Sequence, residues 1–379
     1  MFHSFDINGK TCVGWGIPRA IENIDCNKKK IDCKLYSGEK INPNEKVLFT
    51  INGSSALGVG DSIWIMQYLR DIYKTKSNSR ADMRFVCSDW INEFYAKFLP
   101  RSFNFKREYL LLGDLENMQH LLPAIYYWKG PDGADRGYVQ NKSLIERLYN
   151  WTGMVYNGLG DWVDYTPDEI LYPSKDSIIG SKNLPIKYCL FQWHSSGTCK
   201  NPTPEVNIRL IKHITTRHEL PVIVVGRLTC LDSLQDIPNV INLSGKLEKN
   251  ADALFSLAFG ADLIVTPDSA SLHLGEAYKV PTVGLMSTLP PQYIASKYQI
   301  PAFMFGGGYC PSMPCGVVHA LPKATKCPAG TGDYCQVWNS IDLEWFDLCV
   351  IKTRENRANW RSVKAEDFNV AIRAPITCV

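Results

Sequence analysis

The apolar and polar positions in the second half of the chain alternate between two spacings. Short apolar runs ending in polar or glycine-containing turns recur between segments with an apolar residue every three or four positions. The runs predict strands at 188–193, 222–225, 240–243, 263–265 and 283–285, and the periodic segments predict helices at 204–217, 250–259 and 271–278. Strands that alternate with helices indicate an α/β class with a parallel, doubly wound sheet.

A similar pattern begins earlier in the chain. An apolar run at 47–51 predicts a strand, a glycine-rich loop follows at 52–60, and Asp61 opens a predicted helix before the next strand at 83–87. This order is typical of the first half of a Rossmann-like unit. The glycines of the loop do not follow the dinucleotide fingerprint, so the pattern does not predict a nicotinamide or flavin dinucleotide site.

Less regular stretches suggest the domain organisation. Residues 1–46 hold scattered Gly, Pro and Cys and are expected to be an irregular N-terminal extension. We predict an N-terminal Rossmann-like domain at 47–178 and a C-terminal Rossmann-like domain at 179–345. The two are expected to face each other across a cleft. Residues 346–379 are expected to pack back on the first domain.

Composition and charge exclude several classes of protein. The chain has 379 residues, of which 45% are hydrophobic and 21% charged, as in soluble globular proteins. Its net charge of +3 is too weak to argue for a nucleic-acid partner. The sequence has neither a basic start followed by an apolar run nor 18 successive apolar residues, so we expect a cytoplasmic protein without a transmembrane segment.

The chain has 13 cysteines, most of which look structural. Cys310, Cys315, Cys327 and Cys335 differ because they gather in a stretch rich in glycine and proline. Their spacing is not that of the short cysteine pairs of a zinc ribbon, which favours packing or disulfides over a metal site. Whether they are free, disulfide-bonded or metal-bound is left open.

A polar turn after the predicted strand at 263–265 is the strongest candidate for binding chemistry. Asp268, Ser269 and Ser271 stand at the amino end of a short predicted helix, and His273 follows within its first turn. Free backbone amides, the positive end of the helix dipole and an imidazole together suit a phosphate-bearing ligand. The same residues also describe a capped helix with a hydrogen-bonded histidine, and the motif alone does not separate the two interpretations.

Three separated blocks carry a resemblance to a known family: Ser54-Ser-Ala-Leu-Gly-Val-Gly-Asp61-Ser, Cys189-Leu-Phe-Gln-Trp-His-Ser-Ser-Gly-Thr-Cys-Lys200-Asn-Pro and Asp268-Ser-Ala-Ser-Leu-His273. They resemble motifs of the bacterial heptosyltransferases of glycosyltransferase family 9. The cysteine pattern, with Cys315 preceded by proline and followed by Cys327 and Cys335, is also similar to a stretch in some members of this family. The order agrees over roughly residues 47–340, and several weak motifs in the right order are more specific than one.

The resemblance implies a GT-B architecture in which the domain at 47–178 binds the acceptor and the domain at 179–345 binds the nucleotide-sugar donor. It also implies an inverting transfer of sugar from a nucleotide-diphosphate donor, such as ADP-heptose. It assigns the general base to Asp61 and the stabilisation of the leaving diphosphate to Lys200. The implied donor-binding residues are Ser195, Ser196, Thr198, Lys200, Asp268, Ser269, Ala270 and His273, and the loop on the acceptor side contains Ser55, Gly58 and Gly60.

Some residues depart from the family pattern or carry simpler interpretations. Ala270 replaces the family glycine, and Asn201-Pro202 replaces a tryptophan-proline step. Asp61 alone would equally suit a helix N-cap, and Lys200 a solvated surface lysine. Because no Asp-x-Asp pair follows a predicted strand, we expect neither a metal nor another cofactor.

Two other functions fit the same sequence. A nucleotide-sugar epimerase would convert a nucleotide sugar with no acceptor present, and a non-catalytic nucleotide-sugar or glycan-binding protein would tolerate loss of Asp61. For a transferase, the acceptor hydroxyl belongs to a saccharide, to modified DNA or to a protein. The sequence does not distinguish these acceptors.

Overall fold

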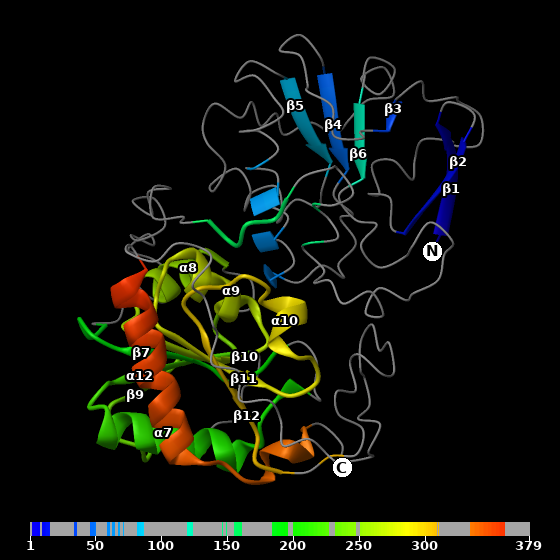
Figure 1. Cartoon of the computed structure of the whole chain (residues 1–379). Helices are drawn as coiled ribbons and strands as arrows, with labels where there is room; N and C mark the ends of the chain where they lie inside the picture. The colour runs from blue at the N-terminus through cyan, green and yellow to red at the C-terminus, as the bar shows by residue number, and fades with distance from the viewer. Residues whose placement is uncertain are drawn as a thin grey trace. The chain divides into compact units, whose positions relative to one another are not determined.

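The computed structural model divides the chain into two compact units, Met1–Tyr156 and Asn157–Val379 (Figure 1). The residues that it describes are 2–7, 10–15, 34–35, 46–50, 59–60, 63–64, 67–68, 71, 82–86, 120–123, 146, 149, 155–160, 184–195, 200–226, 232–247, 251–308, 310 and 334–360. Each unit is described by itself. The predicted domain boundaries at 46, 178 and 345, and the cleft between two domains, stay predictions.

A six-stranded parallel sheet forms the second unit. Its strands are β7 (Cys189–Gln192), β8 (Val222–Val225), β9 (Val240–Asn242), β10 (Leu263–Pro267), β11 (Thr282–Met286) and β12 (Ala302–Phe305). They lie in the order β12-β11-β10-β7-β8-β9, which is the 3-2-1-4-5-6 order of Rossmann folds read from the other edge. The predicted α/β class and doubly wound sheet are confirmed, and β12 is an additional strand.

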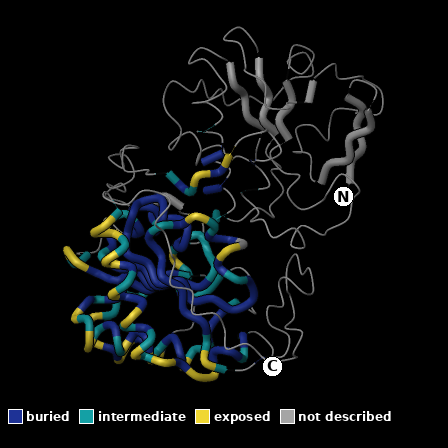
Figure 2. Tube along the Cα trace, in the orientation of Figure 1, coloured by how far each residue is buried: buried dark blue, intermediate teal, exposed yellow. Residues whose placement is uncertain are grey.

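Continuous burial explains why these strands read as apolar runs rather than as alternating ones. Every residue of β8, β10, β11 and β12 is buried, because helices cover both faces of a parallel sheet. Figure 1 shows α7 (Pro204–Arg217) and α12 (Leu343–Asn359) on one side, with α8 (Ala251–Phe259) and α9 (Ala270–Ala277) on the other. The buried positions follow the sheet through the middle of the unit (Figure 2).

Local capping signals set the starts of the two longer helices. Thr203 caps α7, its Oγ1 accepting from the backbone N–H of Val206 at 3.4 Å, with a proline at the start of the helix. Asp342 caps α12 by accepting from the N–H of Trp345 at 3.0 Å. The remaining short elements of the unit are η4 (Asp232–Leu234), α10 (Pro291–Ile294) and η5 (Gln336–Asn339).

Buried polar contacts attach α12 and the turn after α9 to the sheet. Thr353 Oγ1 accepts from the N–H of Thr282 at 2.7 Å and donates to the carbonyl of Ile300 at 2.8 Å. Glu276 accepts from Lys279 Nζ and from the N–H of Ile300, at 2.5 and 2.9 Å. Both charged side chains are almost fully buried, so pairing them avoids the cost of an isolated buried charge.

The first unit contains a four-stranded parallel sheet with the order β3-β6-β4-β5. Its strands are β3 (Lys34–Leu35), β4 (Lys46–Thr50), β5 (Asp82–Val86) and β6 (His120–Pro123). β4 and β5 lie within one residue of the strands predicted at 47–51 and 83–87. β6 falls in an aromatic and turn-rich stretch where no strand was predicted.

We expected residues 1–46 to be irregular, but part of this segment forms regular strands. β1 (Phe2–Ile7) pairs with β2 (Lys10–Trp15) in an antiparallel hairpin whose register aligns Ile7 with Lys10. The connection is Asn8-Gly9, and an Asn-Gly pair between two strand-like runs is a strong hairpin signal. The sequence interpretation gave too little weight to that dipeptide.

Three described helical residues of the first unit share one polar contact. Tyr149 Oη donates to Asp71 Oδ2 at 2.6 Å, and Gln67 Nε2 donates to the same carboxylate. Helical backbone already occurs at Val59 and Gly60, before the predicted start at position 61.

Among the helices that the structure describes, none combines the length and the apolar character needed to cross a membrane.

Candidate functional site

The strand order brings two loops of the second unit together at one place. β7 and β10 are neighbours, with Phe191 aligned to Val265, and their chains continue in opposite directions across the sheet. Ligands of open α/β sheets bind outside the carboxyl ends of the strands at such a switch point. The loop after β7 leads to Lys200, and the turn after β10 begins at Asp268.

An ion pair joins these loops. Lys200 Nζ donates to Asp268 Oδ2, and the two side chains are 29% and 12% exposed. The backbone on either side is also fixed, because Asn201 Oδ1 accepts from the N–H of Ser195 at 2.7 Å and Ser287 Oγ donates to the Lys200 carbonyl at 3.3 Å. Two residues from separate motifs therefore form one partly accessible charged pair.

The start of α9 lies directly after this pair. Ser269 is the N-cap residue, but its Oγ bonds Thr266 Oγ1 at 2.7 Å and makes no capping bond to the helix. Ser271 Oγ donates to Gln192 Oε1 at 3.0 Å, which ties the first turn of α9 to the end of β7. Ala270 has no positive φ, so the alanine at this first helical position introduces no backbone strain.

His273 is a neutral, buried imidazole behind the ion pair. It is 4% exposed, and its Nδ1 shares a 2.6 Å hydrogen bond with Tyr298 Oη. Burial lowers the pKa of His273 to about 4; the charge of Asp268 acts in the opposite direction, and that of Lys200 in the same direction as burial. The imidazole is therefore uncharged near neutral pH, and its contact with a diphosphate stays a prediction.

Sequence reasoning missed several residues that shape this region. Gln192 connects β7 to α9, Asn201 closes the loop between β7 and α7, and Tyr298 supports His273. His194 Nδ1 is buried without a hydrogen-bond partner among the described residues, and burial lowers the pKa of His194 to about 4. A polar run just after a predicted strand was the available signal for Gln192 and His194.

Several predicted site residues lie outside the described residues. These are Ser55, Gly58, Asp61, Ser196 and Thr198, so their roles stay predictions. Gly60 is described as a half-buried helical residue of the first unit. Of the four clustered cysteines, Cys310 and Cys335 are buried, while Cys315 and Cys327 are not described.

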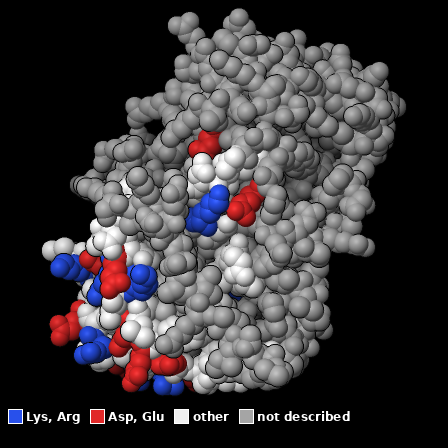
Figure 3. Space-filling model, in the orientation of Figure 1, with Lys and Arg blue, Asp and Glu red and all other residues white. Residues whose placement is uncertain are grey.

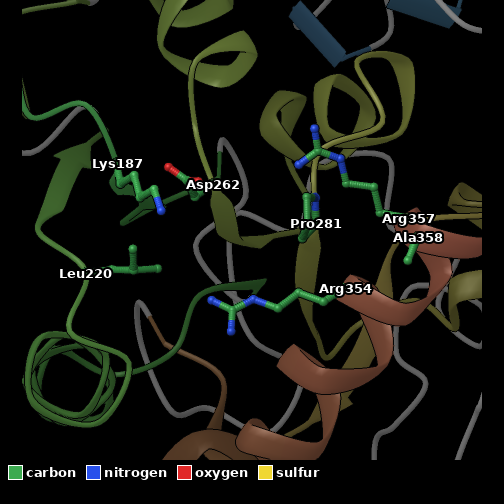
Figure 4. A pocket seen from close by; sticks show the side chains of 7 residues that line it. All are labelled: Lys187, Leu220, Asp262, Pro281, Arg354, Arg357 and Ala358. Atoms are coloured by element: carbon green, nitrogen blue, oxygen red, sulfur yellow. The ribbon is translucent and has the colours of Figure 1, made fainter.

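A hollow of about 450 Å³ lies at the other edge of the sheet. Figure 4 shows Lys187 and Asp262 on one side of it, with Arg354 and Arg357 of α12 on the other. Lys187 and Asp262 precede β7 and β10, so the hollow lies at the amino ends of the strands. The switch-point rule therefore favours the Lys200–Asp268 region over this hollow as a nucleotide site.

Charged side chains do not gather by sign on the face shown in Figure 3. Acidic and basic groups of the described second unit are intermixed there. A nucleic-acid interface needs clustered Lys and Arg, so the described part of this face resembles an ordinary solvated surface.

Comparisons with known proteins support the fold. No family model matches the sequence, and no curated protein matches it either. The dodecameric iron-containing glycosyltransferase TibC from enterotoxigenic E. coli H10407 aligns with 87% of this chain and 82% of its own, at 12% identity and a TM-score of 0.52. TibC in complex with ADP-D-beta-D-heptose aligns with 85% of this chain and 76% of its own, at 11% identity and a TM-score of 0.51. The chain therefore shares the α/β fold of a heptosyltransferase, which confirms at the level of the fold the resemblance that its sequence motifs predicted.

Proposed function

We propose that the protein is an inverting, metal-independent glycosyltransferase. It transfers a sugar from a nucleotide-diphosphate donor, similar to ADP-heptose, to a hydroxyl group of a saccharide or other acceptor. One observation carries the proposal: Lys200 and Asp268 form an accessible ion pair at the switch point of the sheet, directly before the amino end of α9.

This arrangement suits a diphosphate for electrostatic reasons. Lys200 Nζ is a partly exposed ammonium held by Asp268, and an ammonium group is a suitable donor to phosphate oxygens. The first-turn amides of α9 add donors and the positive end of a helix dipole. A TibC structure with the same fold holds ADP-D-beta-D-heptose, which supports a nucleotide sugar as the ligand.

The chemistry follows from the same groups. As the bond between sugar and diphosphate breaks, negative charge grows on the leaving diphosphate, and a fixed cation beside it lowers the barrier. Asp268 holds Lys200 in place through their ion pair, so it acts as a positioning residue. By resemblance, Asp61 takes the proton from the acceptor hydroxyl, which then attacks the opposite face of the sugar.

Donor binding is tested first because it needs no acceptor. A thermal-shift series with ADP-, UDP-, GDP- and CDP-sugars should reveal one class that raises the melting temperature, since a ligand at 100 times its Kd adds about 2.7 kcal/mol of stability. The shift should shrink in Lys200→Ala and remain in Lys352→Ala, an exposed lysine of α12. No shift with any nucleotide sugar overturns the proposal.

Transfer is tested with Asp61→Asn and the donor found by that series. The variant should bind the donor like the parent but release no nucleoside diphosphate in the presence of a glycan or hydroxyl acceptor. The product formed by the parent protein should have the opposite anomeric configuration to the donor, as measured by NMR. Full turnover in Asp61→Asn would exclude its role as base, and conversion of the donor without any acceptor would instead identify an epimerase.

Acceptor class is tested through salt dependence. A saccharide acceptor should bind with little sensitivity to ionic strength. Modified DNA should lose affinity steeply as the salt concentration rises, because counterions released on binding then gain less entropy. The intermixed charges of Figure 3 favour the first result.

A further inference from the structure

Three side chains far from the proposed donor site form a compact cluster. His213 lies in α7, His218 directly follows that helix, and Asp347 lies in α12. Among the residues that the structure describes, this is the group of His, Cys, Asp or Glu side chains arranged closely enough to hold a metal ion. The end of α7 leads into the amino end of β8, while Lys200 and Asp268 follow the carboxyl ends of their strands.

The geometry of the cluster is convergent. His213 Nε2 and His218 Nε2 both reach Asp347 Oδ1, at 2.7 and 2.8 Å. One potential ligand atom from each of the three residues lies within 4.8 Å of the others. Both imidazoles pack edge-on against Phe346, with ring centroids 6.0 Å apart in each case. The apolar ring limits the directions in which the two imidazoles can turn.

The surroundings leave the cluster accessible to solvent. His213, His218 and Asp347 are 17%, 11% and 26% exposed, so an ion can reach them from solvent. Burial lowers the pKa of His218 below its ordinary value, because desolvation disfavours the charged imidazole. Burial opposes ionisation of Asp347, but hydrogen bonds from the two histidines outweigh it and hold the carboxyl pKa below its usual value.

We propose that His213, His218 and Asp347 bind one divalent transition-metal ion, with zinc the best match. Two imidazole nitrogens and a carboxylate oxygen are three of the four ligands of a tetrahedral zinc site, and water supplies the fourth. Each ring then presents its Nε2 lone pair to the ion and carries its proton on Nδ1. This is a change of tautomer and releases no proton. The proposal is independent of the proposed transferase function.

Charges near the cluster set limits on its affinity. Arg217 Nε lies 4.0 Å from Asp347 Oδ2, and the charge of Arg354 also acts on His218. Both cations oppose a bound cation, whereas the negative end of the α7 dipole favours one. The ion joins the end of α7 to α12, so its expected effect is to stabilise the second unit.

The test uses the full chain, stripped of metal, and titration with Zn²⁺ alone followed by isothermal calorimetry and thermal unfolding. His213→Gln and Asp347→Asn should each weaken one binding event by roughly tenfold or more, and should remove the matching rise in melting temperature. Glu355→Gln neutralises an exposed carboxylate on the same helix and should behave like the parent. Far-UV circular dichroism checks that each variant is folded, and two variants guard against the failure of one.

Binding by the cysteines is distinguished with Co²⁺. Thiolate ligands give strong charge-transfer absorption in the near ultraviolet, while a site of nitrogen and oxygen ligands gives only visible d–d bands. The parent should show d–d absorption that both variants lose and Glu355→Gln retains. If the parent and the two variants bind the same number of Zn²⁺ and Co²⁺ ions with equal affinity, the proposal is wrong.

Discussion

Lys200 and Asp268 are the two side chains on which the proposed donor site depends most. Lys200 brings a charge that can meet phosphate, and Asp268 fixes the position of that charge. Behind them, His273 is held neutral by burial, so it contributes shape and a hydrogen bond rather than a second cation. The charge available to a ligand at this site therefore comes chiefly from one lysine and the helix end.

The role of the Lys200 charge can be measured directly. Lys200→Ala should weaken donor binding by about 10- to 100-fold, since a hydrogen bond to a charged group contributes roughly 1.5–3 kcal/mol. Lys200→Arg keeps the charge and should lose less donor affinity than Lys200→Ala. Calorimetric titration of the nucleotide sugar into each variant checks this. Equal affinity in the parent and Lys200→Ala would show that the diphosphate lies elsewhere.

Burial of His273 predicts a pH dependence of stability. Its pKa is about 4 in the folded protein and about 6.5 when unfolded, so the unfolded chain binds the proton first as the pH falls. The folded state should then lose about 3 kcal/mol between pH 7 and 4 from this group. Urea unfolding at several pH values should give a flatter profile for His273→Gln than for the parent. The pKa of His194 is lowered in the same way, so the unfolding free energy of the variant should still depend somewhat on pH. An equal pH dependence in the parent and His273→Gln would contradict the prediction.

At the scale of elements, close packing of α9 on the sheet positions the helix end that is proposed to bind phosphate. A Cβ added at Gly275 would lie 2.0 Å from Thr282 Oγ1 and 3.0 Å from its Cβ. Glycine is required there because a side chain would push α9 away from β11. The Ser271–Gln192 bond fixes the other end of the contact.

Gly275→Ala should destabilise the protein by about 1–3 kcal/mol through overpacking. Adding Thr282→Ala removes the nearest atoms, so the double variant should be more stable than the sum of the two single effects predicts. Chemical denaturation of the parent, both single variants and the double variant gives the coupling energy. Additive effects would show that the two positions do not interact.

At the scale of the whole molecule, the two proposed sites of the second unit lie at opposite ends of the strands of one sheet. The proposed transfer site lies at the carboxyl ends of the strands and uses Lys200 instead of a metal. The proposed zinc cluster lies toward the amino ends and has a structural effect.

Chelation should therefore separate activity from stability. EDTA should lower the melting temperature of the zinc-loaded protein but leave the transfer rate at 25 °C unchanged. The measurements are thermal unfolding and nucleoside diphosphate release on the same sample. If EDTA abolished transfer and Mg²⁺ or Mn²⁺ restored it, metal independence would be wrong.

Elements whose signal is local were the easiest to predict. The helix at 204–217 was predicted with its observed bounds because a threonine cap and proline mark its start. In contrast, α12 buries Phe346, Cys349 and Val350 but leaves Leu348 and Ile351 half-exposed. Apolar residues therefore surround its first turns, and they show no clear period from which to predict the helix or its buried face.

The sequence by itself determined the alternation of strands and helices. It marked the polar turn at Asp268 as a candidate ligand site, and its family resemblance indicated the turn at Lys200. It did so because helix and strand periods, caps and turns are encoded within a few neighbouring residues. Only the tertiary structure decided that these turns meet, that His273 is neutral and that His213, His218 and Asp347 converge. Such features depend on strand order, burial and helix packing, which join residues that are distant along the chain.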